Sequence, residues 1–313
     1  MILPKFDYRR PRELDEALEI YEMYGGEAVF LAGGTDLIPR LKLRLKTPKV
    51  VIDLKGIKEL SQIKIADGFI SIGANTTIFD LKENDVILKN YPPLYLACTL
   101  TSCETLQMRG TVGGNILQDT RCLFYNKSLE WRRAKGFCYK MGADICHATG
   151  GRNVCYANYA SDLAPALLSL DAYLVSVGKN GKRTFPISEL FSGDSRVPFN
   201  LKDGEILKEI LIKNEKKEGM FEKIRIRGSI DYPLINGAIS GDFERKRLVI
   251  GAVGPRPLVY EISTSNLIEA PEILENVYRD LKPVNNTVVS ALYIKKMGRV
   301  IAKRLLNSLK TGD

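Results

Sequence analysis

Apolar and polar positions follow a helical period at the start of the chain and then give way to short apolar runs. The stretch 11–26, PRELDEALEIYEMYGG, places its apolar residues three to four positions apart, which predicts an amphipathic helix. The runs 28–34 (AVFLAGG) and 49–54 (KVVIDL) are apolar, short and bounded by turn residues, which predicts two buried strands. Residues 1–54 are therefore predicted to form a small α/β unit.

The next segment, residues 55–178, contains both strand patterns and helix patterns, and one stretch that fits neither pattern. Its predicted strands are 61–65, 69–74 and 172–178, and its predicted helices are 91–107 and 161–170. Between these helices lies a segment, from about residue 118 to residue 157, that is rich in Tyr, Arg, Lys and Gly and poor in aliphatic side chains. This segment is predicted to be an α+β domain that carries an irregular insertion.

Residues 179–313 show the pattern of an antiparallel sheet followed by helices. Polar or glycine-containing turns separate the predicted strands, which are 204–212, 221–227, 234–240 and 247–254. Two helical patterns, 271–281 and 287–309, close the chain. The whole chain is therefore expected to have an α+β fold in three parts.

Composition and charge narrow the class of protein. With 313 residues, 45% of them hydrophobic, the chain can bury a large core. It has no apolar run of about 18 residues and no signal-peptide order at its start, so we expect no membrane association and a cytoplasmic location. The net charge of +9 suits anionic partners, but no arginine-rich tail or nucleic-acid motif is present, so nucleic acid is not an expected partner.

Two glycine pairs lie where the backbone could approach a ligand. FLAGGTDLIPRL places Gly33 and Gly34 between a strand and a helix, and GTVGGNIL contains Gly113 and Gly114. Such turns aim consecutive N–H groups at one point and can hold phosphate, although each is equally typical of an ordinary tight turn. One pyrophosphate held from both sides would account for both loops.

Several charged positions have two interpretations. Asp162 stands at the start of a predicted helix, where it is either an N-cap or a ligand-binding carboxylate. Lys223, Arg225 and Arg227 alternate along one predicted strand, which is typical of a solvated face but also suits a cavity that holds an anion. The basic stretch 40–49 is either a solvated surface or a patch for a partner.

Four of the six cysteines lie in the aliphatic-poor insertion. Cys122, Cys138, Cys146 and Cys155 are separated by 15, 7 and 8 residues, which is not the C-x-x-C…C-x-x-C pattern and is by itself a weak metal signal. Unrelated thiols, a zinc ion and an iron-sulfur cluster all remain open, and a metal centre would order a segment that cannot order itself by burial. Cys98 and Cys103 fall in an apolar helix, where core packing is expected.

Groups for substrate chemistry are scarce. His147 is the only histidine, which argues against a three-histidine zinc enzyme, and no G-x-S-x-G or other nucleophile motif is present. We therefore expect no catalytic residue in this chain.

Six stretches, in order along the chain, resemble the FAD-binding subunit of molybdenum hydroxylases, the family of the xanthine and carbon monoxide dehydrogenase flavoproteins. They are FLAGGTDLIPRL, ISIGANTTIFDL, TVGGNI, SDLAPALLSLDA, IGAVGPRP and ALYIKKMGRVIAKRLL. The resemblance implies a two-part, PCMH-type FAD-binding region (1–54 and 55–178) and a C-terminal domain of an antiparallel sheet plus helices (179–313). The cysteine-bearing insertion resembles that of the β subunit of 4-hydroxybenzoyl-CoA reductase, which carries a [4Fe-4S] cluster.

The resemblance also assigns roles to residues. It implies that two loops clasp the FAD pyrophosphate and that Asp162 holds polar groups of FAD, with Lys223 near the isoalloxazine. The loop residues are Leu31, Ala32, Gly33, Gly34, Thr35, Asp36 and Leu37, and Thr111, Val112, Gly113, Gly114 and Asn115. Cys122, Cys138, Cys146 and Cys155 would ligate the [4Fe-4S] cluster. One departure is that QMRGTVGGN is two residues shorter than the family's QIRNRGTIGGN, beside Gln107 and Arg109.

The function implied by the resemblance is an electron relay. Electrons would pass from a ferredoxin-like donor through the [4Fe-4S] cluster and FAD to a [2Fe-2S] small subunit and a molybdopterin-binding large subunit, which would reductively dehydroxylate an aromatic acyl-CoA. The complex would be a heterotrimer that dimerises. One alternative is the FAD subunit of an oxidising molybdenum hydroxylase that passes electrons to NAD or another acceptor. A second alternative is a basic RNA-binding module with a structural zinc.

Overall fold

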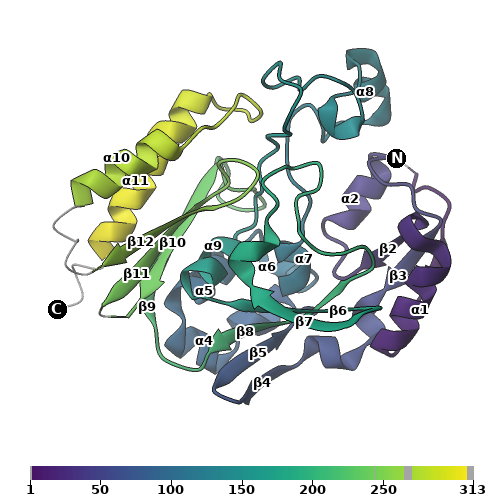
Figure 1. The fold of residues 1–313 in the computed structure, drawn as a ribbon, viewed down its shortest axis with the longest axis horizontal. Helices are drawn as coiled ribbons and strands as arrows, with labels where there is room; N and C mark the ends of the chain where they lie inside the picture. Colours follow the sequence, from purple (N-terminus) through teal and green to yellow (C-terminus); the bar gives the residue numbers. More distant parts are fainter. Residues whose placement is uncertain (1, 243, 264–269, 309–313) are drawn as a thin grey trace.

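The computed structural model describes residues 2–242, 244–263 and 270–308. Three separate sheets and the helices between them make up the chain, which confirms the predicted α+β fold (Figure 1). Within the described ranges, no helix combines the length and apolarity that a membrane crossing needs.

The first unit is a three-stranded parallel sheet. β1 (Asp7–Arg9), β3 (Val50–Asp53) and β2 (Ala28–Leu31) lie in that order, and α1 (Leu14–Tyr24) packs on them through Leu14 and Ala17. The predicted helix and both predicted strands are confirmed. The pattern missed β1, because its three residues are all exposed and carry no apolar signal.

The second sheet has five antiparallel strands and extends beyond the expected boundary. Its order is β4 (Ile63–Ala66), β5 (Phe69–Gly73), β8 (Ile206–Lys213), β6 (Tyr173–Gly178) and β7 (Gly181–Pro186). Since β8 pairs with both β5 and β6, the sheet continues to Lys213 and the expected division at 178/179 is wrong for β7 and β8. The alternation of apolar residues predicted β4, β5, β6 and β8 but missed β7, and it carried no information about which strands pair.

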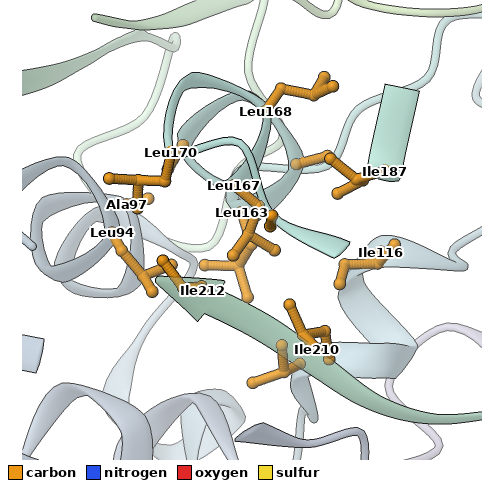
Figure 2. Packing of buried hydrophobic residues seen from close by; sticks show 14 of the residues in the cluster. Leu94, Ala97, Ile116, Leu163, Leu167, Leu168, Leu170, Ile187, Ile210 and Ile212 are labelled. Carbon is orange, nitrogen blue, oxygen red and sulfur yellow. The ribbon is translucent and has the colours of Figure 1, made fainter. Parts of the chain in front are cut away.

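Helices fill the space between the second sheet and the third. The predicted helix 91–107 is two helices, α5 (Pro92–Leu100) and α6 (Glu104–Gln107), separated by Ser102 with φ of 55°. α9 (Leu163–Ser169) is buried along its whole length and packs with α5 over β8 (Figure 2). The remaining helices of the first two units are α2 (Leu37–Lys42), α3 (Ile78–Lys82), α4 (Asp85–Asn90), α7 (Val112–Ile116) and α8 (Leu129–Lys135).

The third unit is a four-stranded antiparallel sheet with two helices on one face. Its order is β12 (Leu258–Ser263), β11 (Arg245–Gly251), β10 (Ile235–Gly241) and β9 (Glu218–Ile224). α10 (Ala270–Asp280) and α11 (Ala291–Ser308) lie side by side over this sheet (Figure 1). The last residue of the expected helix 287–309 lies outside the described residues, and β12 was not predicted.

Candidate functional site

The two glycine loops pack directly against each other. A Cβ atom on Gly33 would lie 1.8 Å from the carbonyl oxygen of Arg109, and one on Gly113 would lie 2.8 Å from the Cβ of Ala74. Real Cβ atoms essentially never approach this closely, so neither position has room for a side chain. The structure therefore brings together the two loops that the sequence placed about 80 residues apart, with bare backbone where they meet.

Two cavities open on either side of this junction. The N-terminal cavity, about 960 Å³, lies between the first unit and the second sheet and is lined by Phe30, Leu54 and Leu207 among others. The central cavity, about 770 Å³, is lined by residues of α6, α7 and the loop after β9. Both share four lining residues, which are Thr35, Asp36, Thr111 and Gly114. An elongated ligand could thus occupy both cavities with its middle at the glycine loops.

Most of the predicted loop residues line these cavities. Ala32, Gly33, Gly34, Leu37 and Gly113 line the N-terminal cavity, whereas Asn115 and Asp162 line the central one, in addition to the four shared residues. Two predicted residues do not: Leu31 and Val112 are buried in hydrophobic clusters on the other side of the backbone. Leu31 is the last residue of β2, where neighbouring side chains face opposite sides of the sheet, and Val112 is the first residue of α7, with its side chain in the core.

Asp162 is a buried carboxylate at the wall of the central cavity. Its Oδ2 accepts a hydrogen bond from Lys223 Nζ at 2.6 Å, and its Oδ1 accepts one from Asn236 Nδ2 at 3.0 Å. Burial raises the pKa of Asp162, and Lys223 opposes that rise. Asp162 occupies the N-cap position of α9, but the backbone N–H of Ala164 donates to the hydroxyl of Ser161, and the carboxylate of Asp162 makes no capping hydrogen bond.

Lys223 lies behind Asp162 and does not line the cavity. Its side chain is only 1% exposed, which excludes a solvated face. Arg225 donates to the carbonyl of Leu100 at 2.9 Å, while Arg227 is exposed and pairs with Asp231. Lys223 of β9 is therefore turned toward the central cavity through Asp162, whereas Arg225 and Arg227 of the predicted strand 221–227 lie beyond the end of β9 at Ile224.

Gln107 is a polar residue of the central cavity whose role the sequence did not reveal. Its Nε2 donates to the carbonyls of Cys98 at 3.1 Å and Thr101 at 2.7 Å, which fixes the orientation of the amide. Its Oε1 is buried and has no protein partner. A buried acceptor without a donor is costly, so this atom suits an N–H group of a ligand.

The four cysteines of the insertion line one small cavity. Cys122, Cys138, Cys146 and Cys155 meet there, together with Tyr125, Lys140 and His147 among its other lining residues. The segment that holds them includes α8 and projects from the body of the chain (Figure 1). The two cysteines outside it differ from each other: Cys98 is buried as predicted, whereas Cys103 is partly exposed at the start of α6 and is not a core residue.

The surroundings of these thiols suit a ligand set. Burial raises the pKa of Cys122 and raises that of Cys155 to about 11. Both sulfurs also accept hydrogen bonds from nearby backbone N–H groups, which oppose the rise in pKa. Such N–H groups also stabilise thiolates bound to a metal centre. A metal would have to displace the thiol protons.

The four sulfurs are not arranged around a single ion. Among residues 2–242, 244–263 and 270–308, no group of three or more His, Cys, Asp or Glu side chains is placed to hold a metal ion. Four thiolates around one zinc, at about 2.3 Å each, would stand within about 4 Å of one another. In a [4Fe-4S] cluster each thiolate binds a different iron, so the sulfurs stand farther apart and enclose a wider space.

The cysteine segment is attached to the first unit by a buried arginine. Arg132 of α8 is 1% exposed and donates to the carbonyl of Leu43 at 2.6 Å and to that of Arg44 at 3.1 Å. It also donates to the carbonyl of Lys127 within its own segment, at 3.0 Å. Part of the basic stretch 40–49 is therefore a contact within the chain and not a free patch.

Comparisons with known proteins identify relatives along the whole chain. The family model described as the FAD binding domain in molybdopterin dehydrogenase matches residues 4–212. The aldehyde oxidoreductase FAD-binding subunit PaoB of Escherichia coli is 27% identical over 304 residues, which are 93% of this chain and 95% of that protein. The nicotinate dehydrogenase FAD-subunit of Eubacterium barkeri is 24% identical over 96% of this chain and 94% of that protein.

The fold has close structural counterparts. A chain of the carbon monoxide dehydrogenase from Hydrogenophaga pseudoflava superposes with a TM-score of 0.77 at 23% identity, covering 98% of both chains. A chain of quinoline 2-oxidoreductase from Pseudomonas putida 86 gives 0.76 at 21% identity, again over 98% of both chains. At these identities the likeness shows a shared fold.

Proposed function

This chain belongs to the family of FAD-binding domains of molybdopterin dehydrogenases, and on that premise we propose that it is the FAD-binding, electron-transferring subunit of a molybdenum-containing oxidoreductase. The observation that carries the proposal is the pair of cavities that meet at the two glycine loops, where Gly33 and Gly113 leave no room for a side chain. FAD is an elongated molecule with a pyrophosphate at its middle, which matches this arrangement.

The residues present fit FAD. The backbone N–H groups of the glycine loops would hold the pyrophosphate, and Gln107 Oε1 offers a buried acceptor to a ring N–H in the central cavity. Asp162, fixed by Lys223 and Asn236, would bind polar groups of the same ligand. When bound, FAD exchanges electrons singly or in pairs, and the protein contributes its placement and its electrostatic surroundings.

We propose further that Cys122, Cys138, Cys146 and Cys155 bind one [4Fe-4S] cluster. Their convergence on a single cavity supports this assignment, because a [4Fe-4S] cluster is held by four thiolates. A cluster there would also order a segment that is poor in aliphatic side chains. Zinc would order the segment equally well but could transfer no electrons.

The partners and substrate that we propose follow from the family and from this cluster. Several relatives are named as FAD subunits or medium chains, which supports a multi-subunit complex. We propose a heterotrimer that dimerises, with a molybdopterin-binding large subunit, a [2Fe-2S] small subunit and a ferredoxin-like donor. The reaction would be reductive dehydroxylation of an aromatic acyl-CoA, as in 4-hydroxybenzoyl-CoA reductase. All six cysteines are free thiols, which supports a cytoplasmic location.

An oxidising molybdenum hydroxylase is the second candidate. The relatives named as aldehyde oxidoreductase, nicotinate dehydrogenase and carbon monoxide dehydrogenase favour it. In that case electrons would leave through FAD to NAD or another acceptor, and the cysteine cavity would hold zinc or no metal. Metal analysis of protein purified without air separates the two candidates.

We expect the flavin to be FAD and to be bound without a covalent link. Neither glycine loop contains a His or Cys that could attach a flavin, and the two cavities suit a dinucleotide. Denaturation by heat or acid should therefore release free FAD, identified by chromatography. Release of FMN, or flavin that stays with the precipitated protein, would contradict the two-cavity assignment.

We expect the isolated chain to show no turnover of an aromatic acyl-CoA. Its sequence contains a single histidine and no nucleophile motif, so we propose that the substrate chemistry takes place in a partner subunit. The purified chain should reduce artificial acceptors at most, whereas the assembled complex should dehydroxylate 4-hydroxybenzoyl-CoA with a reduced low-potential donor. Product formation by the chain alone would refute the assignment. A complex that reduces NAD but not the thioester would support the oxidising alternative.

A further inference from the structure

A chain of buried and half-buried ion pairs connects the cysteine cavity with the glycine loops. Lys140 Nζ lies 2.6 Å from Asp119 Oδ1, and the other oxygen of Asp119 lies 3.1 Å from an Arg40 nitrogen. Arg40 also lies 3.6 Å from Asp36 Oδ2, and the backbone N–H of Asp119 donates to the same oxygen at 3.3 Å. Arg121 pairs with the remaining oxygen of Asp36. We call these five residues the ionic bridge.

The ionic bridge reaches both candidate sites. Lys140 lines the cysteine cavity, Arg40 lines the N-terminal cavity, and Asp36 lines both cavities at the glycine loops. The side chains nearest the cysteine cavity are nearly inaccessible, with 5% exposure for Lys140 and 8% for Asp119. Solvent therefore screens this ion pair less than it screens surface ion pairs.

The bridge carries more positive than negative charge. Lys46 is close enough for burial and the charges of Arg40 and Lys140 to lower its pKa. Together with Lys46, the bridge comprises four cations and two carboxylates, an excess of two positive charges. A pyrophosphate at the glycine loops and thiolates in the cysteine cavity would place negative charge at both ends. The pyrophosphate and the thiolates would each neutralise part of the excess positive charge of these four cations.

We propose that Lys140 is a positioning residue which links the two sites, so that a cluster held by the four cysteines strengthens the binding of FAD. This proposal rests on the proposed function. A cluster would order the segment around Cys138 and thereby hold Lys140 against Asp119. Asp119 in turn fixes Arg40 and Asp36 beside the pyrophosphate position. Without the cluster, the segment around Cys138 would hold Lys140 against Asp119 less firmly, and the pyrophosphate loop would lose part of this support.

The proposed coupling between the cluster and FAD has an expected magnitude, and it must act in both directions. Couplings between two sites in one protein typically change affinity by about 5- to 150-fold, and we expect about tenfold here because one lysine carries the contact. By thermodynamic necessity, bound FAD should raise the affinity of the chain for the cluster by the same factor. Both effects should disappear together when Lys140 is replaced.

The test compares the Kd of FAD in cluster-loaded and iron-free full-length chains, measured by quenching of flavin fluorescence under nitrogen. In the parent, the cluster-loaded chain should bind FAD about tenfold more tightly. In K140M the two Kd values should agree within about twofold, and K140R should recover part of the difference. K135M is the matched control, because Lys135 is an exposed lysine of the same segment, and it should keep the difference found for the parent.

Iron and sulfide are determined in every sample first, so that failure of this inference can be told from failure of the proposed function. A parent that takes up no iron and sulfide overturns the cluster assignment and this linkage with it. A loaded parent whose FAD affinity equals that of the iron-free chain overturns the linkage alone, as does K140M with an unchanged ratio. Should K140M not fold, D119N removes the same ion pair with a side chain of the same shape and decides the question by the same ratio.

Discussion

Serine in place of any one of Cys122, Cys138, Cys146 and Cys155 is expected to reduce the iron and sulfide per FAD from about four of each to less than one. A [4Fe-4S] cluster needs a thiolate on every iron, and a serine hydroxyl is a far poorer ligand for iron at neutral pH. All four sulfurs line one cavity, so the four variants should behave alike. FAD should remain bound, with lower affinity, because the cavities at the glycine loops contain none of these cysteines.

The two cysteines outside the segment provide the controls. C103S changes a partly exposed thiol at the start of α6, and C98S changes a fully buried one, yet both should retain the parent's iron and sulfide. C98S should cost stability, because it buries a hydroxyl in an apolar core. Stoichiometric zinc in the parent purified without air, or equal loss of iron from C103S, would show that the cysteine cavity is not an iron-sulfur site.

Alanine at Gly33 is expected to weaken FAD binding by at least about tenfold and to lower the free energy of unfolding by about 1–3 kcal/mol, the usual cost of forcing atoms into a packed site. The new Cβ would lie 1.8 Å from the carbonyl oxygen of Arg109, so one glycine loop must move away from the other. Any such movement separates the two sets of N–H groups that would hold the pyrophosphate. Flavin titration and thermal unfolding of G33A measure the two effects.

G26A is the matched control for this substitution. Gly26 lies in the same unit, has no positive φ, and would place its Cβ where no other atom is within 4 Å. Its free energy of unfolding should therefore equal that of the parent, and its Kd for FAD should agree with the parent's within about twofold. If G33A binds FAD as tightly as G26A, the glycine loops do not form the pyrophosphate site.

The cysteine segment shows how much a local sequence pattern can predict. The shortage of aliphatic residues and the concentration of cysteines predicted a segment that a bound metal could order, and the structure places all four sulfurs at one cavity. The spacing of the cysteines could not show whether they converge, because that depends on how the segment turns back on itself. Arg132 fixes its position on the first unit, and nothing in the sequence distinguished this arginine from the exposed Arg133 beside it.

The sequence by itself determined the local elements, since helix and strand periods reflect which side of each element is buried, and α1, β5 and α9 formed where their patterns predicted. It also marked the glycine loops, because bare backbone is a local property. Only the tertiary structure decided which distant elements meet. It inserted β8 between β5 and β6, left Gln107 with an unpaired oxygen in the central cavity, and joined Lys140 to Asp36 through Asp119 and Arg40. Strand pairing and ion pairing depend on contacts between residues far apart in the chain, and no period of 2 or 3.6 residues encodes them.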